Sequence, residues 1–353
     1  MAAKRAGILD QFVAISAESV YGQAATAFNR VVPANNDSWE PEIQEVSTSA
    51  HRPGRQAMQA DQSIQIPVGG TGSIETMVAE AGMFLLMRDL LDEWSSALGS
   101  VANSNLKTLT LKSNALGPRS DVVSSLSALI GRADVAQARR ESLYAGCMVT
   151  DWELAGSVGE PIMLTINYDW AADSTRTQSL DNAYTAPSLS KIIKGPFYSW
   201  RDLSISVDGD QLATLKSFSL TGNRGLDTER RYLQGTSVKA QPQRDTVPEY
   251  GLVLECDLDA KTREIRDLWG SDGLTGEIVV TLTGRTDQKT GGSDAIYPSI
   301  AFTMATAKVE GDEPAMELEG PTGISLNLAG KDLGDGSTPA LQCVIAAAQT
   351  AID

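Results

Sequence analysis

The sequence predicts a mainly β fold, a β-sandwich or half-barrel with a flanking α-helix, on three observations. Most regular segments alternate apolar with polar residues, which is the two-residue period of a strand that buries one face. Gly, Pro, Asn and Asp separate these segments, as turns between strands require. Helical periodicity is confined to few places among the 353 residues.

The alternating segments define the expected strands in chain order. We expect each of them to bury one face in a core and to turn the other toward solvent or another subunit. The segments are FVAIS (12–16), SIQIPV (63–68), LKTLTL (106–111), CMVTDWEL (147–154), PIMLTINY (161–168), LSISV (203–207), TLKSFSLT (214–221), GLVLECDL (251–258), GEIVVTLTG (276–284), SIAFTMATAKV (299–309) and AMELEG (315–320).

The longer of two helical segments is expected over about residues 74–98, where apolar residues recur at helical spacing. The stretch Gly69–Ser73 is expected to form the flexible turn that leads into this helix. Its glycines lack the spacing and the GK[ST] ending of a phosphate-binding loop. After the helix, residues 99–142 are expected to form an excursion, of which the part from Asp121 is either helical or irregular.

The second helix is expected over about residues 260–269. The Asp259 side chain can cap its first turn by accepting hydrogen bonds from Thr262 and Arg263. Gly270 can end it, because glycine readily adopts the left-handed conformation that follows many helices.

Short internal matches predict that the chain contains two similar units. Each unit is expected to have strands, a helix that ends in Arg-Asp-Leu, and a hairpin with a Glu-Pro turn. The matched pairs are Met87–Leu90 with Ile265–Leu268, Tyr144–Thr150 with Tyr297–Thr303, and Glu160–Met163 with Glu313–Met316.

The division into units follows from a polar stretch near the middle of the chain. Residues 173–195 are rich in Ser and Thr and lack a regular period, so they are expected to be a linker. The expected domains are therefore residues 1–190 and 191–330, with 331–353 as a C-terminal tail. The Ala-rich end of this tail is expected to dock either on a neighbour or on its own domain.

The residues that usually carry catalysis are sparse in this chain. His51 is its one histidine, and Cys147, Cys256 and Cys343 form no CxxC pair. A histidine-based triad, a two-histidine metal site and a closed zinc site therefore lack the residues they need. The sequence predicts no enzyme, no catalytic residues, no cofactor and no metal centre.

The charge composition argues against several kinds of partner. Asp and Glu total 45 against 29 Lys and Arg, which gives a formal net charge of −16. Such a protein as a whole is not drawn to nucleic acid or anionic lipid. No apolar run approaches the ~20 residues of a membrane-spanning helix.

With these patterns in place, the sequence resembles the major tail (tail tube) proteins of long, non-contractile-tailed, siphovirus-like bacteriophages. The resemblance extends to about residue 325 and rests on patterns rather than on a catalytic signature. It is carried by FVAISAESVYGQAATAF (12–28), the polar stretch at 42–58, YAGCMVTDWELAGSVGEPIMLTI (144–166) and DLSISVDGDQLATLKSFSLTGNRG (202–225).

The resemblance implies a structural virion protein, made in the host cytoplasm, whose rings stack into a hollow tube for genomic DNA. Family rings contain six tube domains, so a chain with two would need three copies; six chains per ring is the alternative. Stacking would involve residues 1–30 together with 40–62 or 99–142. The implied partners are further copies of the chain, a tape measure protein, and tail terminator and distal tail proteins.

The same resemblance implies a channel lining that does not grip DNA. Acidic and neutral side chains fulfil this condition, because each Lys or Arg that neutralises a phosphate adds affinity. The strand residues expected to face the channel are Asp151 and Glu153 in one half and Glu255 and Asp257 in the other. A solvated outer face is the alternative position for each of them.

Two other function classes also fit a strand-rich chain. One is a β-sandwich adhesin or carbohydrate-binding module, which should carry exposed aromatic platforms, whereas aromatic residues are 6% of this chain and its tryptophans are scattered. The other is a hydrolase of β-rich fold, which the sparse catalytic inventory disfavours.

Overall fold

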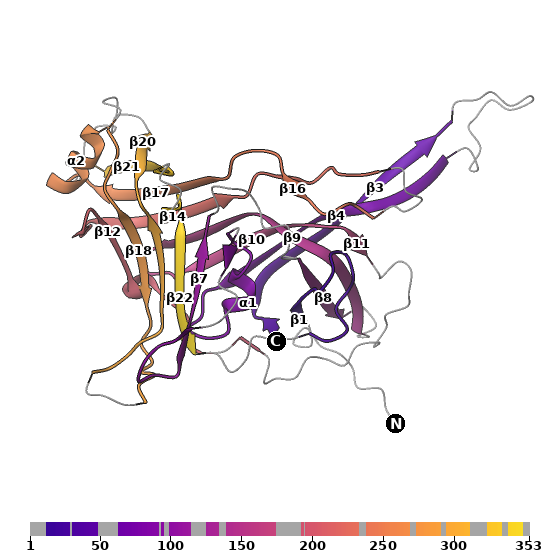
Figure 1. Ribbon diagram of the computed structural model, residues 1–353, viewed down its shortest axis with the longest axis horizontal. Helices are drawn as coiled ribbons and strands as arrows, with labels where there is room; N and C mark the ends of the chain where they lie inside the picture. Colours follow the sequence, from indigo (N-terminus) through magenta and orange to yellow (C-terminus); the bar gives the residue numbers. More distant parts are fainter. Residues whose placement is uncertain are drawn as a thin grey trace, which may run out of the picture.

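The protein consists of one long antiparallel sheet with two smaller sheets packed beneath it, and a hairpin that projects from one end (Figure 1). One hydrophobic core runs between these layers and includes Trp152, Leu220 and Phe302. The computed structural model describes residues 12–28, 30–48, 63–91, 93–94, 99–113, 125–133, 139–173, 192–193, 195–232, 238–268, 273–290, 294–310, 323–333 and 338–348.

We call the long sheet the main sheet. Its strands lie in the order β3-β4-β10-β9-β14-β17-β21-β20, and every neighbouring pair is antiparallel. Their bounds are β3 (Ala34–Ser47), β4 (Ser63–Met77), β9 (Arg139–Ser157), β10 (Met163–Trp170), β14 (Leu215–Asn223), β17 (Glu249–Asp257), β20 (Ala307–Glu310) and β21 (Gly323–Gly330).

Two covering sheets lie under the main sheet. The first has the order β2-β1-β8-β9, with β11 also paired to β9; the second has the order β13-β12-β18-β19-β22-β7-β5, with β6 also paired to β7. Their further strands are β1 (Phe12–Ala17), β2 (Arg30–Val32), β5 (Glu93–Trp94), β6 (Gly99–Ser100), β7 (Leu106–Lys112), β8 (Leu126–Ala133), β11 (Ala172–Asp173), β12 (Leu203–Val207), β13 (Asp210–Gln211), β18 (Ile278–Thr283), β19 (Ser299–Met304) and β22 (Gln342–Ala348).

The strand order of the main sheet repeats. In β3-β4-β10-β9, the four strands stand in the order first, second, fourth and third along the chain, and β14-β17-β21-β20 has the same order. The covering sheets repeat as well, since β1 pairs with β2 and β8 just as β12 pairs with β13 and β18. A helical segment follows the second strand in both cases, α1 after β4 and α2 after β17.

The two repeats meet in one continuous ladder. Strand β9 pairs with β14 from Ser157 opposite Ser217 to Asp151 opposite Asn223. No change of sheet separates the two halves there, so the main sheet is a single surface across both.

Strand β9 also joins the layers, because its first part belongs to a covering sheet and its second part to the main sheet. The strand passes from one to the other near Gly146, whose φ of 71° favours glycine. The buried Glu18 carboxylate holds this bend by accepting hydrogen bonds from Gly146 N (2.8 Å), Ser127 Oγ (2.7 Å) and Ser125 Oγ (2.7 Å). It also accepts one from Gly22 N (3.0 Å), which ties the N-terminal turn to β9.

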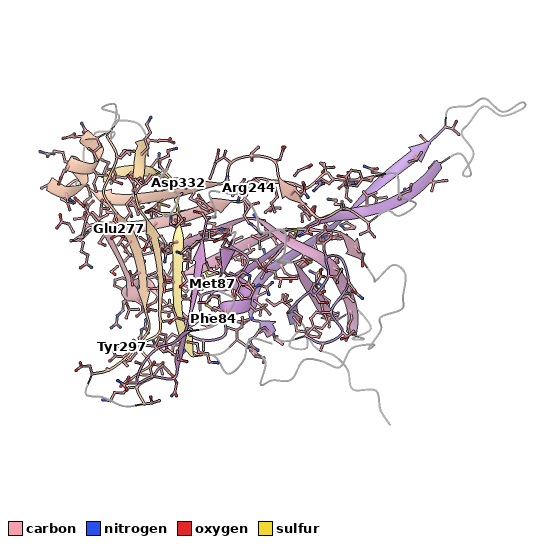
Figure 2. All side chains as sticks on the ribbon, in the orientation of Figure 1. Phe84, Met87, Arg244, Glu277, Tyr297 and Asp332 are labelled. Carbon is pink, nitrogen blue, oxygen red and sulfur yellow. The ribbon has the colours of Figure 1, made fainter. Side chains whose placement is uncertain are left out.

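The helix predicted over residues 74–98 is wrong. Strand β4 continues to Met77, and the helical structure is limited to one turn, α1 (Phe84–Met87). Ile74 pairs with Ile166 of β10, so this backbone already forms sheet hydrogen bonds. All four residues of α1 are buried, and Figure 2 shows Phe84 and Met87 beneath the main sheet. The apolar residues are therefore surrounded by core and are not the stripe of an amphipathic surface helix.

The turn predicted at Gly69–Ser73 is also wrong, because these residues lie within β4. These glycines instead allow aromatic rings to pack closely against the strand. A Cβ atom on Gly70 would lie 2.5 Å from the Trp170 ring, and one on Gly72 would lie 2.5 Å from the Trp39 ring. Two indole rings thus pack against the bare backbone of β4.

The excursion predicted over residues 99–142 consists largely of strands where the structure describes it. Strand β8 lies between β1 and β9, and β7 joins the second covering sheet. The C-terminal tail docks on its own chain, since β22 pairs with β19 and β7. Most of the predicted linker, and the predicted strand at 315–320, lie outside the described residues.

The helix predicted at residues 260–269 is confirmed as α2 (Ala260–Asp267). Thr262 N donates to Asp259 Oδ1 (2.8 Å), and Asp259 N donates to Thr262 Oγ1 (2.8 Å). The hydrogen bond from the Thr262 backbone is the main cause that lowers the pKa of Asp259. Gly270 lies outside the described residues.

A segment between β14 and β17, described over residues 224–232 and 238–248, crosses to the root of the projecting hairpin (Figure 1). It contains β15 (Leu226–Asp227) and β16 (Gln243–Arg244), which pair with each other. From it, Lys239 Nζ contacts Asp169 Oδ1 of β10 at 2.7 Å, and both side chains are only 2% exposed. We call this segment the crossing segment and this pair the clamp.

Burial raises the pKa of Asp169 to about 6, and Lys239 opposes this shift. Because the pKa of Asp169 is higher in the folded than in the unfolded protein, the contribution of this carboxyl to stability is complete below about pH 4. It is lost as the pH rises through about 6. At neutral pH the ionised carboxylate depends on its lysine.

We predict that removing either partner of the clamp destabilises the protein. Lys239→Met should lower the free energy of unfolding by about 3–5 kcal/mol at pH 7, since the buried Asp169 carboxylate then lacks its lysine. Asp169→Asn should lower it by less, because Lys239 Nζ keeps Glu42 Oε2 at 3.7 Å. The double variant Asp169→Leu/Lys239→Met should be within about 2 kcal/mol of the native protein. Denaturant unfolding measures this; a double variant worse than both singles would contradict it.

We further predict that Asp259→Ala lowers the free energy of unfolding by about 1 kcal/mol, the usual loss for a helix cap. Asp267→Ala, at the exposed end of the same helix, is the matched control and should stay within about 0.5 kcal/mol. Equal effects of the two substitutions in denaturant titrations would argue against the cap.

Candidate functional site

The main sheet presents a broad polar face on the side away from the core. Its alternate residues point there, as in Glu153, Thr221 and Glu255, while Trp152, Leu220 and Leu254 between them are buried. This polar face includes Ser38, Glu40, Thr71, Ser73, Glu75, Asp151, Glu153, Thr165, Asn167, Ser217, Ser219, Thr221, Val253, Glu255, Asp257, Lys308, Glu310, Ser325 and Asn327.

The four sequence-predicted residues lie on this one face. Asp151 and Glu153 come from β9, and Glu255 and Asp257 come from β17, with β14 between the two strands. The structure thus brings acids from both halves of the chain onto one surface. The acids Glu40, Glu75 and Glu310, which sequence reasoning missed, lie on the same face; their alternation within β3, β4 and β20 is the signal that could have found them.

Hydroxyl and amide groups on neighbouring strands orient the acids. Ser219 Oγ donates to Glu153 Oε1 (2.6 Å), and Ser217 Oγ donates to Glu255 Oε2 (2.7 Å). Asp151 accepts from Thr150 Oγ1 (2.8 Å) and from Asn167 Nδ2. These three carboxylates therefore lie among small polar groups, whereas Asp257 Oδ1 pairs with Lys216 Nζ at 2.5 Å.

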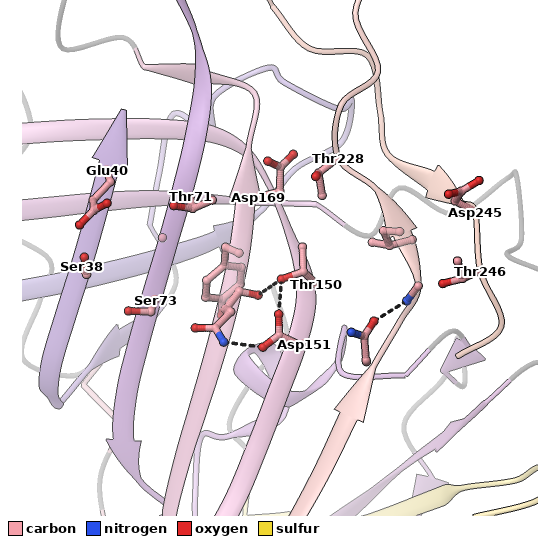
Figure 3. Close-up of a pocket in the computed structure, with 16 residues that line it drawn as sticks. Ser38, Glu40, Thr71, Ser73, Thr150, Asp151, Asp169, Thr228, Asp245 and Thr246 are labelled. Carbon is pink, nitrogen blue, oxygen red and sulfur yellow. Dashed lines mark hydrogen bonds between the residues drawn. The ribbon is translucent and has the colours of Figure 1, made fainter. Parts of the chain in front are cut away.

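The polar face is hollowed in two places. A hollow of about 780 Å³ lies over Asp151, Glu153 and Thr221. A second hollow of about 660 Å³ lies between the sheet and the crossing segment; Figure 3 shows Glu40, Asp151 and Asp245 around it. Both are wide and open, so they form parts of a trough rather than an enclosed ligand cavity.

Among the described residues, no three His, Cys, Asp or Glu side chains gather closely enough to hold a metal ion. Within that same part of the chain, no helix is long and apolar enough to cross a membrane. The buried Cys147 and Cys343 thiols have raised pKa values because burial disfavours their thiolates.

The projecting hairpin is the second prominent surface. Strand β10 stops at Trp170, opposite Gly70, so beyond that point β3 and β4 pair only with each other in the sheet. Their last pair is Ser47 with Ser63. We call residues 41–47 and 63–69 the arm (Figure 1).

Similarity to a known family identifies the class of protein to which this chain belongs. A comparison with curated proteins gives no match. A family model described as phage tail tube protein matches residues 9–331, a range that includes every main-sheet strand, the arm and both helices. The chain therefore belongs to the phage tail tube protein family and is a structural component of a bacteriophage tail.

Proposed function

We propose that this chain assembles into rings that stack into the tail tube, with the polar face of the main sheet lining a channel for DNA. The observation that carries the proposal is this face itself, which is continuous across both halves of the chain and rich in acids. Asp151, Glu153, Glu255 and Asp257 then repel the phosphates of passing DNA. A lining of this kind lets DNA slide without being held.

We further propose that each chain supplies two tube units to its ring, within residues 1–190 and 191–330. The repeated strand order of the main sheet supports this duplication. The sequence matches agree with it, because Tyr144–Thr150 lies in β9 and most of Tyr297–Thr303 lies in β19, which pairs with β18 as the first part of β9 pairs with β8. A six-unit ring then contains three chains.

The edges of the main sheet give a physical reason for the ring to close. Strand β3 pairs with β4 on one side only, and its other edge ends the main sheet. Long unpaired edges invite pairing with another chain, and closed barrels remove them. In the proposed ring, the β3 end of one main sheet meets the β20 end of the next.

Stacking is assigned to the arm. It extends beyond the body of the subunit; its first strand, residues 41–47, lies within the predicted stacking range 40–62, and its second strand, residues 63–69, directly follows that range. The other range considered, 99–142, supplies strands to the covering sheets instead. Tape measure protein inside the tube, and tail terminator and distal tail proteins at its ends, are the further partners proposed.

We predict three chains per ring. Native mass spectrometry of isolated rings should give three chain masses, and cross-sections of tubes in electron microscopy should show threefold symmetry with a pseudo-sixfold outline. Six chain masses would support ring assembly but would refute the proposal that each chain supplies two tube units. A monomer that never assembles would refute the ring itself.

We predict that native tubes do not bind duplex DNA at moderate salt, whereas Glu153→Lys/Glu255→Lys tubes do. The variant's binding should weaken steeply with salt, since each lysine that neutralises a phosphate contributes a slope of about −0.9 in log K against log salt. Electrophoretic mobility shifts with short duplexes measure both the binding and its dependence on salt.

The matched control is Glu264→Lys on α2, an exposed glutamate away from the polar face. It should leave DNA binding unchanged. Tight, salt-sensitive binding by native tubes would contradict the proposed channel lining, as would an equal gain of binding in the control.

A further inference from the structure

An exposed apolar surface lies at the end of the main sheet opposite the arm. Val158, in the turn between β9 and β10, is 59% exposed, and Trp200 is 44% exposed. The turn lies where β10 begins at Met163, whereas the arm extends past the other end of β10 at Trp170. The arm and this apolar surface are therefore at opposite ends of the same strands.

The backbone holds this surface in a fixed position. Trp200 N donates to Glu160 O (3.2 Å), and Ile162 N donates to Tyr198 O (3.0 Å). Val158 N donates to Lys216 O (3.1 Å), which ties the turn to β14. Preorganised apolar groups of this kind lose little freedom when a partner binds.

A groove lies between the two exposed side chains. Its volume is about 200 Å³, and its walls include Val158, Trp200, Leu203 and Leu215. Tryptophan is enriched among the residues that carry most of the binding energy in protein interfaces. We call Val158, Trp200 and this groove the acceptor surface.

The arm carries apolar side chains that match it. Ile64 is 64% exposed and pairs with Val46, which is 57% exposed, so both lie on one face of the hairpin. A two-stranded hairpin is marginally stable in water and gains stability by packing on another surface. At about 3.3 Å per residue, Ser63–Gly69 extends roughly 20 Å past β10, which suits a contact beyond the subunit's own body.

We propose that the acceptor surface receives the arm of a chain in the adjacent ring, with Trp200 as its anchor. This inference rests on the proposed stacking of rings. The arm and the acceptor surface differ and lie at opposite ends of the subunit, so each ring presents its arms on one side and its acceptor surfaces on the other. Such a head-to-tail contact does not close on itself and repeats along the tube. Exposed Arg201 beside Trp200 and Glu45 in the arm give the contact opposite charges.

The test uses one variant on each face, Ile64→Asp on the arm and Val158→Asp on the acceptor surface. Both replace exposed side chains, so rings and the midpoint of thermal unfolding should be unchanged. Negative-stain microscopy and sedimentation should show single rings and a complete loss of tubes for each variant alone. Trp200→Ala should give the same loss.

Mixing the two kinds of variant ring gives the decisive result. The arms of Val158→Asp rings are intact, and so is the acceptor surface of Ile64→Asp rings, so the mixture should form stacks of two rings and nothing longer. Val247→Asp, an apolar-to-acid change at an 80% exposed site on the rim of the polar face, is the matched control and should form native tubes.

Several outcomes would overturn the inference. Tubes of native length from Val158→Asp or Trp200→Ala would show that the acceptor surface lies outside the contact. Loss of ring formation in Val158→Asp, or a mixture that stays as single rings, would also contradict the inference. Absence of rings from the native chain is a different result, because it refutes the proposed function itself.

Discussion

The antiparallel ladder between β9 and β14 is the interaction on which the rest of the molecule depends. It joins two similar groups of strands into one sheet, so that the buried faces of both share one core and the polar faces of both form one surface. A sheet with one buried face must alternate apolar and polar residues in strict register. A shift of one residue at this ladder would send Trp152 into water and Glu153 into the core.

The long strand β9 makes that ladder possible. Its first part is fixed in a covering sheet by β8, and the bend at Gly146 directs its second part into the main sheet. Glu18 stabilises the bend through its carboxylate, which explains why the N-terminal Glu-x-x-Tyr-Gly turn lies so close to it. A second buried carboxylate, Glu80, accepts from Arg285 N (2.6 Å) and so connects the first half with the second covering sheet.

The proposed functional features lie on surfaces rather than in a pocket. As a channel lining, the polar face needs no reactive group, only an excess of negative charge. The arm and the acceptor surface need exposed apolar groups at fixed positions. These requirements agree with a tail tube protein and with a chain that has one histidine and few candidates for catalysis.

Much of the fold was determined by local sequence. The alternating segments around Asp151, Leu252 and Ile300 became strands, and Asp259 capped its helix, because a strand's period and a helix cap are set by near neighbours in the chain. The alternation also placed Asp151, Glu153, Glu255 and Asp257 on faces opposite the core, although it could not show that β14 would bring them onto one surface.

Tertiary structure decided the remainder. Residues 74–98 have a helical period, but pairing with β10 and burial between sheets made residues 74–91 strand, one helical turn and core. Gly70 and Gly72 indicate a turn by themselves, but pairing with β3 and β10 makes them strand residues, and the rings of Trp170 and Trp39 pack on their bare backbone. The clamp and the acceptor surface join segments far apart in the chain. Their formation depends on which backbones meet, a choice made by the packing of whole sheets and not by any local stretch of residues.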